Sequence, residues 1–582
     1  MLNLPVVVLG LSGALTHDPS AAIYVDGKLI AAAEEERFTR QKHAKNEMPL
    51  HAARYCLSEA GLKPRDVNVV AFPFAKTSIF GKARWHYARR YWYAPERSID
   101  ALFNGNRHYR RNVKKVQKLI AELGISWQNI EFDAVEHHMA HASSAYHLSG
   151  FDGKVAILGI DGKGEYATTF FGYGEKGHIH KIKEFYDPDS LGQLYASFTE
   201  YLGFEMLDGE YKVMGMAPYG DPDLYDLSRL IKFDGKEIRV NTQLVNTIGL
   251  RRYKEGRKGY YFSKKLVDWL GPKRKGDIAD DPYIHYAASM QKIYEDVALQ
   301  LIDTYLRDVL EQTGKLVFAG GGALNVKLNQ KILELPYVTE LFVQPAASDA
   351  GTAVGAASFA SWRRGIEPEP MRHVYLGPGF STKQCIDACE THHERPAYQR
   401  LENIVQKTAE LVNEGNPVAW CQGRMEFGPR ALGGRSIIAN PSFPGIADKI
   451  NRQIKFRERW RPFCPSILDT VASEMIQTDH PAPYMTITFE VSELWKKRVP
   501  EVVHEDGTAR VQIVDAETNP RYYRLLKEME RLNGNGVVLN TSMNRRGEPM
   551  VCSPTDALNM FYGSDLEYLV MEDLLVTKRP SG

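Results

Sequence analysis

The sequence has few cysteines, and they are not spaced for a metal ribbon or a disulfide framework. Six cysteines occur in 582 residues, no pair follows a C-x-x-C pattern, and Cys385 and Cys389 are four positions apart. Zinc ribbons and disulfide-stabilised folds need denser or more closely spaced pairs. We therefore expect reduced thiols and a cytoplasmic protein.

Long hydrophobic runs are also missing. No stretch reaches the ~18 consecutive apolar residues that a membrane-spanning helix needs. The chain starts Met1-Leu2-Asn3-Leu4-Pro5 and lacks the basic start of a secretory leader. We expect no membrane span from these two features.

The chain carries almost no net charge. Lys and Arg number 73 against 72 Asp and Glu, a formal net charge of +1. No global field therefore gathers nucleic acid or an anionic membrane, and polyanion binding requires a local patch. Residues 82–118 form one such patch, with 11 Lys or Arg, 2 acidic residues and interleaved aromatic residues. This segment favours either a phosphorylated, sugar-rich or RNA ligand, or a solvated helical face with its aromatic side chains packed inward.

What the sequence does contain is typical of a globular α/β protein. Hydrophobic residues make up 43% and charged residues 25%. Three short β-branched runs end in glycine turns, within residues 6–13, 155–164 and 316–322. Uninterrupted apolar runs are typical of strands buried on both faces. The glycines either reverse the chain or bring backbone N–H groups to a phosphate.

A proline-rich and glycine-rich segment divides the chain. It begins with Ile366-Glu367-Pro368-Glu369-Pro370 and closes with Gly377-Pro378-Gly379. Such punctuation marks loops and linkers. We predict a first domain over residues 1–365, a linker over 366–380 and a second domain over 381–582.

The sharpest local motif runs from Glu136 to Tyr146. Its small residues favour a helix, in which His137 and His141 stand at i and i+4 on one face and could hold one metal ion. Asp161, at the end of a predicted strand, and Asp349, at the start of a predicted helix, could complete the ligand set. Asp349 could instead cap its helix. Imidazole and carboxylate ligands leave iron(II), zinc and manganese open.

Further polar residues suit acid–base chemistry and anion binding. His17 could deprotonate an acceptor hydroxyl near neutral pH, or it could be a loop histidine bonded to the backbone. In the C-terminal part, residues 422–436 hold three arginines and residues 455–462 hold four cations. Guanidinium groups bind phosphate and carboxylate oxygens bidentately. Glycine, proline and phenylalanine beside Arg430 and Arg461 favour a shaped pocket over a solvated face.

Together these residues resemble the O-carbamoyltransferases of the NodU/CmcH family, which includes antibiotic carbamoyltransferases such as the tobramycin enzyme. The similarity covers nearly the whole chain, in order. The stretches that carry it are residues 17–21, 34–43, 137–146, 212–220, 320–325, 348–357, 427–435 and 455–465.

The resemblance implies an α/β fold in two parts. The N-terminal part would be an actin-like ATPase-superfamily domain with two subdomains, as in the threonylcarbamoyl-transferases, and the C-terminal part a YrdC-like domain. In such enzymes the C-terminal domain makes carbamoyl adenylate from carbamoyl phosphate and ATP, with Mg²⁺. The N-terminal domain then transfers the carbamoyl group to a hydroxyl of a sugar-containing acceptor, such as an antibiotic, a nodulation-factor-like glycan or a lipopolysaccharide-core glycan.

The resemblance also implies residue roles. His137, His141 and Asp349 would bind the metal, iron(II) in the family, with Asp161 near it and His17 as the general base. The residues that would hold carbamoyl phosphate and the adenylate are Lys42, Arg430, Lys455, Arg461, Arg510 and Ser542. Those that would line the nucleotide site of the N-terminal domain are Gly320, Gly321, Gly322 and Asn325.

Two other hypotheses remain at this point: a threonylcarbamoyl-type tRNA modification enzyme, and a non-catalytic protein that binds nucleotide and metal. The near-zero net charge favours a carbamoyltransferase without a nucleic-acid partner. A homodimer is left open. Leu15 stands where the tobramycin enzyme has an acidic acceptor-binding residue, which favours a different acceptor. We expect residues 82–118 to bind an anionic glycan or phosphosugar.

Overall fold

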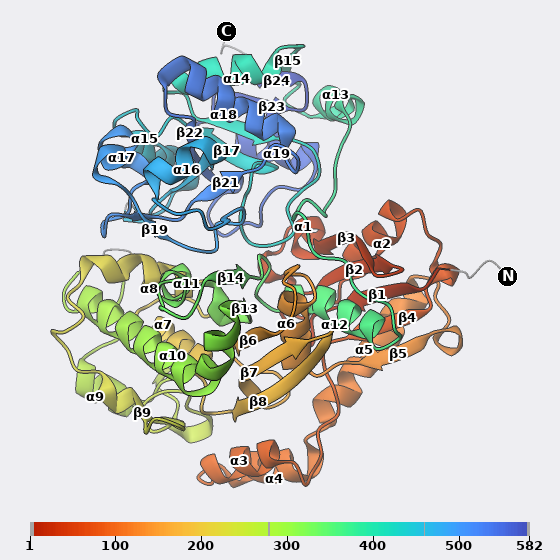
Figure 1. Ribbon diagram of the computed structural model, residues 1–582, viewed down its shortest axis with the longest axis vertical. Helices are drawn as coiled ribbons and strands as arrows, with labels where there is room; N and C mark the ends of the chain where they lie inside the picture. The colour runs from red at the N-terminus through yellow and green to blue at the C-terminus, as the bar shows by residue number, and fades with distance from the viewer. Residues whose placement is uncertain (1–4, 277–279, 459, 579–582) are drawn as a thin grey trace. The chain divides into compact units, whose positions relative to one another are not determined.

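The computed structural model describes residues 5–276, 280–458 and 460–578 (Figure 1). The chain divides into two compact units. The first contains the residues up to Ile30 and Asn46–Met371, and the second contains Ala31–Lys45 and the residues from Arg372 on. The short segment 31–45, with Lys42, thus belongs to the C-terminal unit. The predicted domain limits at 365 and 381 stay a prediction.

The N-terminal unit contains two five-stranded sheets with the same strand order. The first runs β3-β2-β1-β4-β5 and the second β8-β7-β6-β13-β14. In each, the central strand pairs antiparallel with the strand that follows it and parallel with a later strand, which pairs parallel with the edge strand. This duplicated order confirms the predicted α/β fold, with two subdomains in the N-terminal part.

The strands of these sheets have the following bounds: β1 Val7–Leu11, β2 Ser20–Val25, β3 Lys28–Glu34, β4 Val69–Phe72, β5 Glu131–Ala134, β6 Val155–Ile160, β7 Ala167–Glu175, β8 His178–Tyr186, β13 Lys315–Ala319 and β14 Glu340–Val343. Every residue of β1 and of β6 is buried, as their uninterrupted apolar runs predict. Asp26 and Gly27 both have positive φ (48° and 84°), the conformation of a tight hairpin turn between β2 and β3.

Two helices pack against each other and against the two sheets. Helix α6 (His137–Tyr146) lies against β6, β7 and β13, and α12 (Gly351–Trp362) lies against β1, β2 and β4. Their contact is close because it is lined by small residues. A Cβ on Gly355 of α12 would come within 1.8 Å of the carbonyl oxygen of Ala140 on α6. The sheets therefore hold the N-terminal end of α6 and the loop before α12 in fixed positions.

The remaining longer helices of this unit are α2 Leu50–Glu59, α3 Lys82–Arg90, α4 Pro95–Asn104, α5 Arg107–Glu122, α7 Leu191–Tyr201, α8 Glu210–Met216, α9 Lys264–Leu270, α10 Tyr283–Thr313 and α11 Val326–Leu333. The longest, α10, ends at Gly314, whose φ of 67° is the left-handed conformation that glycine adopts at helix ends. Within the described ranges, no helix is long and apolar enough to cross a membrane.

The C-terminal unit is built on a mixed eight-stranded sheet in the order β15-β24-β23-β16-β17-β22-β18-β21. Helices α14 and α18 pack together over its central strands, and α13 and α19 pack on each other near β23 and β24. Ser381 and Ser553 begin α13 and α19, each in a reciprocal capping box with the residue three positions on. The α/β prediction is confirmed for this part too.

The strands of this sheet and the longer helices of the unit are β15 Ala397–Arg400, β16 Val418–Cys421, β17 Arg435–Ala439, β18 Cys464–Leu468, β21 Gln512–Val514, β22 Val537–Ser542, β23 Tyr568–Met571, β24 Leu574–Thr577, α13 Thr382–Thr391, α14 Ile404–Asn413, α16 Asp469–Met475, α17 Glu493–Arg498, α18 Pro520–Asn533 and α19 Pro554–Tyr562. All six cysteines of the chain are buried and free, as the absence of paired spacing predicted.

Candidate metal centre and anion-binding site

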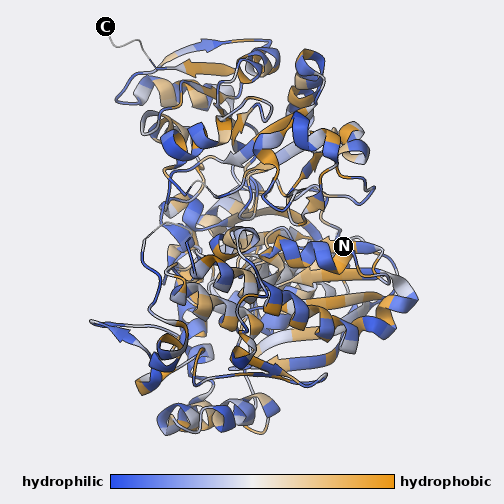
Figure 2. Ribbon diagram, turned by 90° about the vertical axis from the view of Figure 1, so that its left-hand side faces the viewer, coloured by the Kyte–Doolittle hydropathy of each residue, from blue (hydrophilic) through white to orange (hydrophobic). Residues whose placement is uncertain are grey.

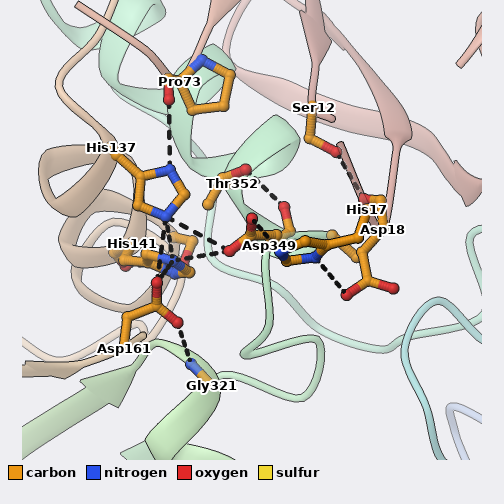
Figure 3. A network of polar contacts seen from close by, with 12 residues as sticks. Ser12, His17, Asp18, Pro73, His137, His141, Asp161, Gly321, Asp349 and Thr352 are labelled. Carbon is orange, nitrogen blue, oxygen red and sulfur yellow. Dashed lines mark hydrogen bonds and ion pairs between the residues drawn. The ribbon is translucent and has the colours of Figure 1, made fainter. Parts of the chain in front are cut away.

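Four side chains from three segments meet in the N-terminal unit (Figure 3). His137 and His141 come from one face of α6, Asp161 directly follows β6, and Asp349 precedes α12. One possible ligand atom of each lies within 4.8 Å of the others. The Nε2 atoms of the two histidines are 3.1 Å apart. The sequence predicted the histidine pair on one helix face with Asp161 and Asp349 as further ligands, and the structure brings all four side chains together.

Distances within the cluster are short on every side. His137 Nε2 is 3.4 Å from an oxygen of Asp161 and 3.4 Å from an oxygen of Asp349. The same oxygens are 4.0 and 3.7 Å from His141 Nε2. The four side chains are 1–10% exposed. Buried ionisable groups at this spacing need either shared protons or a bound cation to offset the carboxylates.

Hydrogen bonds outside the cluster orient its members. The Nδ1 of His137 lies 3.3 Å from the carbonyl oxygen of Pro73, which can only accept, so Nδ1 donates there and Nε2 is the ring nitrogen that faces the cluster. The backbone N–H of Gly321 donates to Oδ1 of Asp161 at 3.0 Å and leaves Oδ2 toward the histidines. These bonds fix the ring and the carboxylate in the geometry that a metal ligand set requires.

The electrostatics of the cluster favour positive charge. Burial alone lowers the pKa of His137, but Asp349 and Asp161 outweigh it and hold that pKa well above its usual range. Burial raises the pKa of Asp349, but His137 and His17 outweigh it and hold it well below its usual range. Burial also raises the pKa of Asp161, but the hydrogen bond with His137 outweighs it and lowers that pKa to about 2, so both carboxylates are ionised. Two imidazoles and two carboxylates are a donor set that iron(II), zinc and manganese accept, so the residues fit a divalent metal ion.

His17 lies at the side of this cluster. Its Nε2 is 3.8 Å from Asp349, and its Nδ1 is 3.2 Å from the carboxylate of Asp18. Its side chain is 21% exposed, whereas those of the two cluster histidines are 1% exposed. Burial lowers the pKa of His17, but Asp349 and Asp18 outweigh it and raise that pKa to about 9. His17 thus joins the buried cluster to a more open side of the unit.

Asp349 does not cap a helix. Helix α12 begins after Ala350, with no side-chain cap, while the carboxylate of Asp349 faces the histidines. Its backbone carbonyl accepts from the hydroxyl of Thr352. The capping alternative considered from the sequence is wrong, because the turn is closed by backbone and Thr352 contacts and the carboxylate is left for the cluster.

The glycine turn after β13 lies beside the cluster. Gly320 has a φ of 92°, and a Cβ there would come within 2.3 Å of the carbonyl oxygen of Ile160. A Cβ on Gly322 would meet the hydroxyl of Tyr294 at 2.5 Å. The glycines are thus needed for close packing between β6 and β13, and Gly321 also bonds Asp161.

Asn325 is occupied by the protein itself. Its Oδ1 accepts from the backbone N–H of Leu328 as the cap of α11, and from the side chain of Gln291. Its Nδ2 donates to the same glutamine at 3.0 Å. The structure therefore gives this side chain a structural role at the head of α11, and a nucleotide contact through it stays a prediction.

A second polar centre lies in the C-terminal unit around Lys455. The Lys455 ammonium donates to the carbonyl oxygen of Ser542 at 2.7 Å and to Oδ1 of Asn544 at 2.7 Å, and its side chain is buried. Burial lowers the pKa of Lys455, and the nearby Arg457, Arg461 and Lys42 lower it further. Segment 31–45 therefore brings Lys42 to the same centre. Cations that destabilise one another in a buried place form a site that an anion would stabilise.

The other predicted anion ligands are placed less centrally. The guanidinium of Arg510 donates to the sulfur of Cys464 on β18, the neighbour of β22, which ends at Ser542. Arg461 lies 3.6 Å from the buried carboxylate of Glu458, and Arg430 is half-buried. Arg459, the fourth cation of the 455–462 run, lies outside the described residues.

Comparison with known proteins decides the family. Residues 7–358 match the family described as Carbamoyltransferase N-terminus, and residues 409–578 match Carbamoyltransferase C-terminus. The chain belongs to the carbamoyltransferase family. The prediction of a carbamoyl-transferring enzyme is thereby confirmed.

Several relatives of this carbamoyltransferase span nearly its whole length. An uncharacterized protein of Synechocystis sp. is 37% identical over 98% of this chain and 96% of its own. Nodulation protein NolNO of Sinorhizobium fredii is 34% identical over 98% of this chain and 80% of its own. Among solved structures, full-length HypF in its phosphate- and nucleotide-bound form is 12% identical over 61% of this chain and 55% of its own, with a TM-score of 0.29.

Two arginines that the sequence assigned to anion binding hold the carbamoyltransferase fold together instead. Arg435 is buried and donates to the carbonyl oxygens of Cys552, Gln422 and Pro378, among others. Arg424 donates to the carbonyl oxygens of Leu376 and Gly377. The sequence could not reveal this, because a glycine-rich frame supplies free carbonyls as readily as it supplies space for a ligand.

Sequence reasoning gave no role to two residues of these centres. Glu165 is half-buried and accepts from the backbone N–H groups of His137 and Ala75, so it fixes the start of α6. Asn544 bonds both Lys455 and the hydroxyl of Ser542. Asn544 lies directly after β22, among other short polar residues that could have drawn attention to it. No local pattern marks Glu165, because its partners are distant in the sequence.

Proposed function

We propose that this carbamoyltransferase makes carbamoyl adenylate from carbamoyl phosphate and ATP in its C-terminal unit, and transfers the carbamoyl group to a hydroxyl of a sugar-containing acceptor at the metal centre of its N-terminal unit. The observation that carries the proposal is the buried cluster of His137, His141, Asp161 and Asp349, with His17 beside it. The family membership supplies the transferred group.

The N-terminal centre fits the transfer step. A divalent metal ion held by the cluster would polarise an oxygen of the carbamoyl donor and offset the charge of the carboxylates. His17 would take the proton of the acceptor hydroxyl, whose oxygen bonds to the carbamoyl carbon as the bond from that carbon to AMP breaks. That role requires a neutral imidazole. The negative charge of Asp349 raises the pKa of His17 to about 9, so this charge must be offset before His17 can act as a base.

The C-terminal centre fits the activation step. The phosphate oxygens of carbamoyl phosphate and ATP would be neutralised by Lys455, Lys42 and Arg461. The hydroxyl of Ser542 would donate or accept a hydrogen bond in the same site. Hydrolysis of carbamoyl phosphate gives carbamate and phosphate. Attack of a carbamate oxygen on the α-phosphorus of ATP then gives carbamoyl adenylate and releases pyrophosphate. The lowered pKa of Lys455 supports the proposal, because an anion beside the ammonium would stabilise its charged form.

The proposal is tested by separating the two half-reactions. The full-length protein is incubated with ATP, carbamoyl phosphate and a panel of glycans and antibiotics. Pyrophosphate release and the mass increase of the acceptor are then measured. His137→Ala should lower bound metal and acceptor carbamoylation by about a hundredfold and leave pyrophosphate release unchanged. Lys42→Met and Lys455→Met should lower pyrophosphate release by a similar factor and leave the metal content unchanged.

Matched controls are exposed residues of the same types, His393→Ala and Lys383→Met, which should change neither reaction. Wild-type protein that releases no pyrophosphate would overturn the activation step. A His137→Ala variant with normal metal content and normal transfer would overturn the metal centre. Activity that appears only with tRNA would replace the sugar acceptor by an RNA.

A further inference from the structure

The segment around α3 and α4 exposes large hydrophobic side chains. The exposed fraction is 90% for Phe80, 52% for Trp85, 72% for Trp92, 56% for Ile99 and 71% for Phe103. Ile99 and Phe103 stand at i and i+4 on α4, so they share one face of that helix. We call residues 80–104 the α3–α4 hairpin. Side chains of this size at this exposure mark a contact surface, because isolated exposed apolar residues do not gather in one segment.

The inner side of the α3–α4 hairpin is firmly anchored in the N-terminal unit. Arg90 makes two hydrogen bonds to the buried carboxylate of Asp189, at 3.0 and 2.9 Å, and His86 contacts the same carboxylate at 2.8 Å. Tyr91 is buried and donates to the carbonyl oxygen of Asn246. The hydrophobic residues on the outer side are therefore held outward by a fixed support.

Aromatic side chains of residues 82–118 pack inward on one side of the segment, as one interpretation of the sequence expected, and are exposed on the opposite side. Tyr91 packs inward against Tyr87 and Tyr93. Trp92 and Phe103 are largely exposed, so their side chains face the solvent. Arg90 is engaged by Asp189, so it is not available for the glycan that the sequence analysis assigned to this segment.

Exposed cations occur within the hairpin and directly after it. On α3, Arg89 lies four positions after Trp85, so the two side chains share a helix face. The other exposed cations of the hairpin are Lys82 and Arg97, and those of the following helix α5 are Arg107, Arg110, Arg111, Lys114 and Lys118. Among the residues that the structure describes, Arg89, Arg97, Arg110 and Arg111 form no ion pair. Figure 2 shows hydrophilic and hydrophobic residues interleaved along the helices at the lower end of this unit.

We propose that the outer face of the α3–α4 hairpin docks on an anionic lipid surface. Tryptophan and phenylalanine side chains are stable at the boundary between headgroups and acyl chains, where their rings are buried while polar atoms stay hydrated. Arginines beside them pair with headgroup phosphates, and each basic residue near an anionic bilayer adds to the attraction. The contact is peripheral and needs no spanning helix.

Charge argues for lipid over a second copy of the chain. In a two-fold symmetric dimer the same patch would face itself, which would bring Arg89, Arg97 and their neighbours against like charges. The segment has only two acidic residues, Glu96 and Asp100, to offset them. Single-stranded RNA would need a groove that tracks its backbone with rings for stacking. Here an aliphatic residue, Ile99, and a phenylalanine share a helix face. An anionic bilayer satisfies both the apolar and the cationic side chains at once.

The experiment measures vesicle binding by the full-length protein. Co-sedimentation is compared between vesicles of phosphatidylcholine alone and vesicles that also contain phosphatidylglycerol. The protein should bind only the anionic vesicles, more weakly at high salt, with a blue shift of tryptophan emission. Trp92→Ser with Phe103→Ser, and separately Arg89→Glu with Arg97→Glu, should each weaken binding by about tenfold or more.

Matched control variants change equally exposed residues elsewhere. Leu224→Ser with Leu250→Ser removes two other exposed apolar side chains, and Lys232→Glu with Lys383→Glu makes the same charge change outside the hairpin. These should bind as the wild type does, and all variants should keep the wild-type melting temperature. Failure of the wild type to bind anionic vesicles overturns the proposal, as do hairpin variants that bind normally. The proposal is also overturned if these variants instead abolish dimerisation or RNA binding. None of these measurements depends on carbamoyl transfer.

Discussion

At the residue scale, several polar groups of the two centres are held by specific partners. In the N-terminal unit, a carbonyl fixes the proton of His137 and a backbone N–H fixes Asp161. In the C-terminal unit, Ser542 and Asn544 hold the ammonium of Lys455. Such preset partners lower the reorganisation that a bound cation or anion would otherwise cost.

His147, at the end of α6, gives a pH prediction at this scale. Its Nδ1 accepts from Ser143 at 2.8 Å and its Nε2–H donates to the carbonyl oxygen of Gly177 at 2.9 Å, so the ring is held neutral. Burial lowers its pKa to about 4. Above pH 6.5 neither the folded nor the unfolded chain is protonated there. As the pH falls toward 4 only the unfolded chain takes the proton, so the free energy of unfolding decreases by up to about 3 kcal/mol.

Urea unfolding at about pH 7.5 and about pH 5 checks this effect in the wild type and in His147→Gln. The wild type should lose about 2 kcal/mol more between these pH values than the variant, which cannot titrate at this position. His393→Gln removes an exposed histidine and should follow the wild type. An equal pH response of His147→Gln and the wild type would contradict the prediction.

At the scale of elements, the contact between α6 and α12 decides the geometry of the metal centre. Helix α6 carries both histidines, and the loop before α12 carries Asp349. The two helices approach closely because Gly355 faces the backbone of Ala140. The hydroxyls of Ser143 and Ser358 also bond across the contact at 2.7 Å. A change in this spacing would move the carboxylate away from the imidazoles.

Gly355→Ala tests that link. The added methyl group has no room against the carbonyl oxygen of Ala140, so the helices must separate, with a cost of about 3 kcal/mol to stability. We expect a lower melting temperature and weaker metal binding, measured by calorimetry and metal titration. Gly162→Ala is the matched control, because a Cβ there meets nothing within 4 Å although it follows Asp161 directly. Wild-type metal affinity in Gly355→Ala would contradict the argument.

At the scale of the whole molecule, the two centres lie in different units of the chain. The metal cluster lies within Asn46–Met371, with His17 from the first 30 residues, and the lysine centre lies in the C-terminal unit. Each unit has its own sheets and its own core. Loss of one centre should therefore leave the other intact.

Metal removal gives the corresponding prediction. A ligand that binds only the folded state stabilises that state. A chelator should therefore lower the melting temperature of the N-terminal unit by several degrees and leave the C-terminal transition in place, as measured by differential scanning calorimetry. Restoring the metal ion should reverse the shift, and His137→Ala should melt like the chelated wild type. A chelator that shifts both transitions equally would show that the units unfold together.

The sequence by itself determined the features that depend on neighbouring residues. The i, i+4 spacing of His137 and His141 and the buried strand of 155–160 follow from local periodicity, so the structure reproduces them. The family followed from ordered motifs along the chain, and the comparisons confirm it.

Local sequence patterns do not bring distant residues together; the family resemblance named candidates, and the tertiary structure shows which of them meet. Asp161 and Asp349 reach the histidines only because two sheets and two helices bring their segments together. Lys42 joins the C-terminal centre because segment 31–45 packs with that unit. The guanidinium of Arg435 donates hydrogen bonds to backbone carbonyl oxygens, whereas an arginine in the same motif could have contacted a ligand. Contacts of this kind depend on packing between segments, which local sequence patterns do not encode.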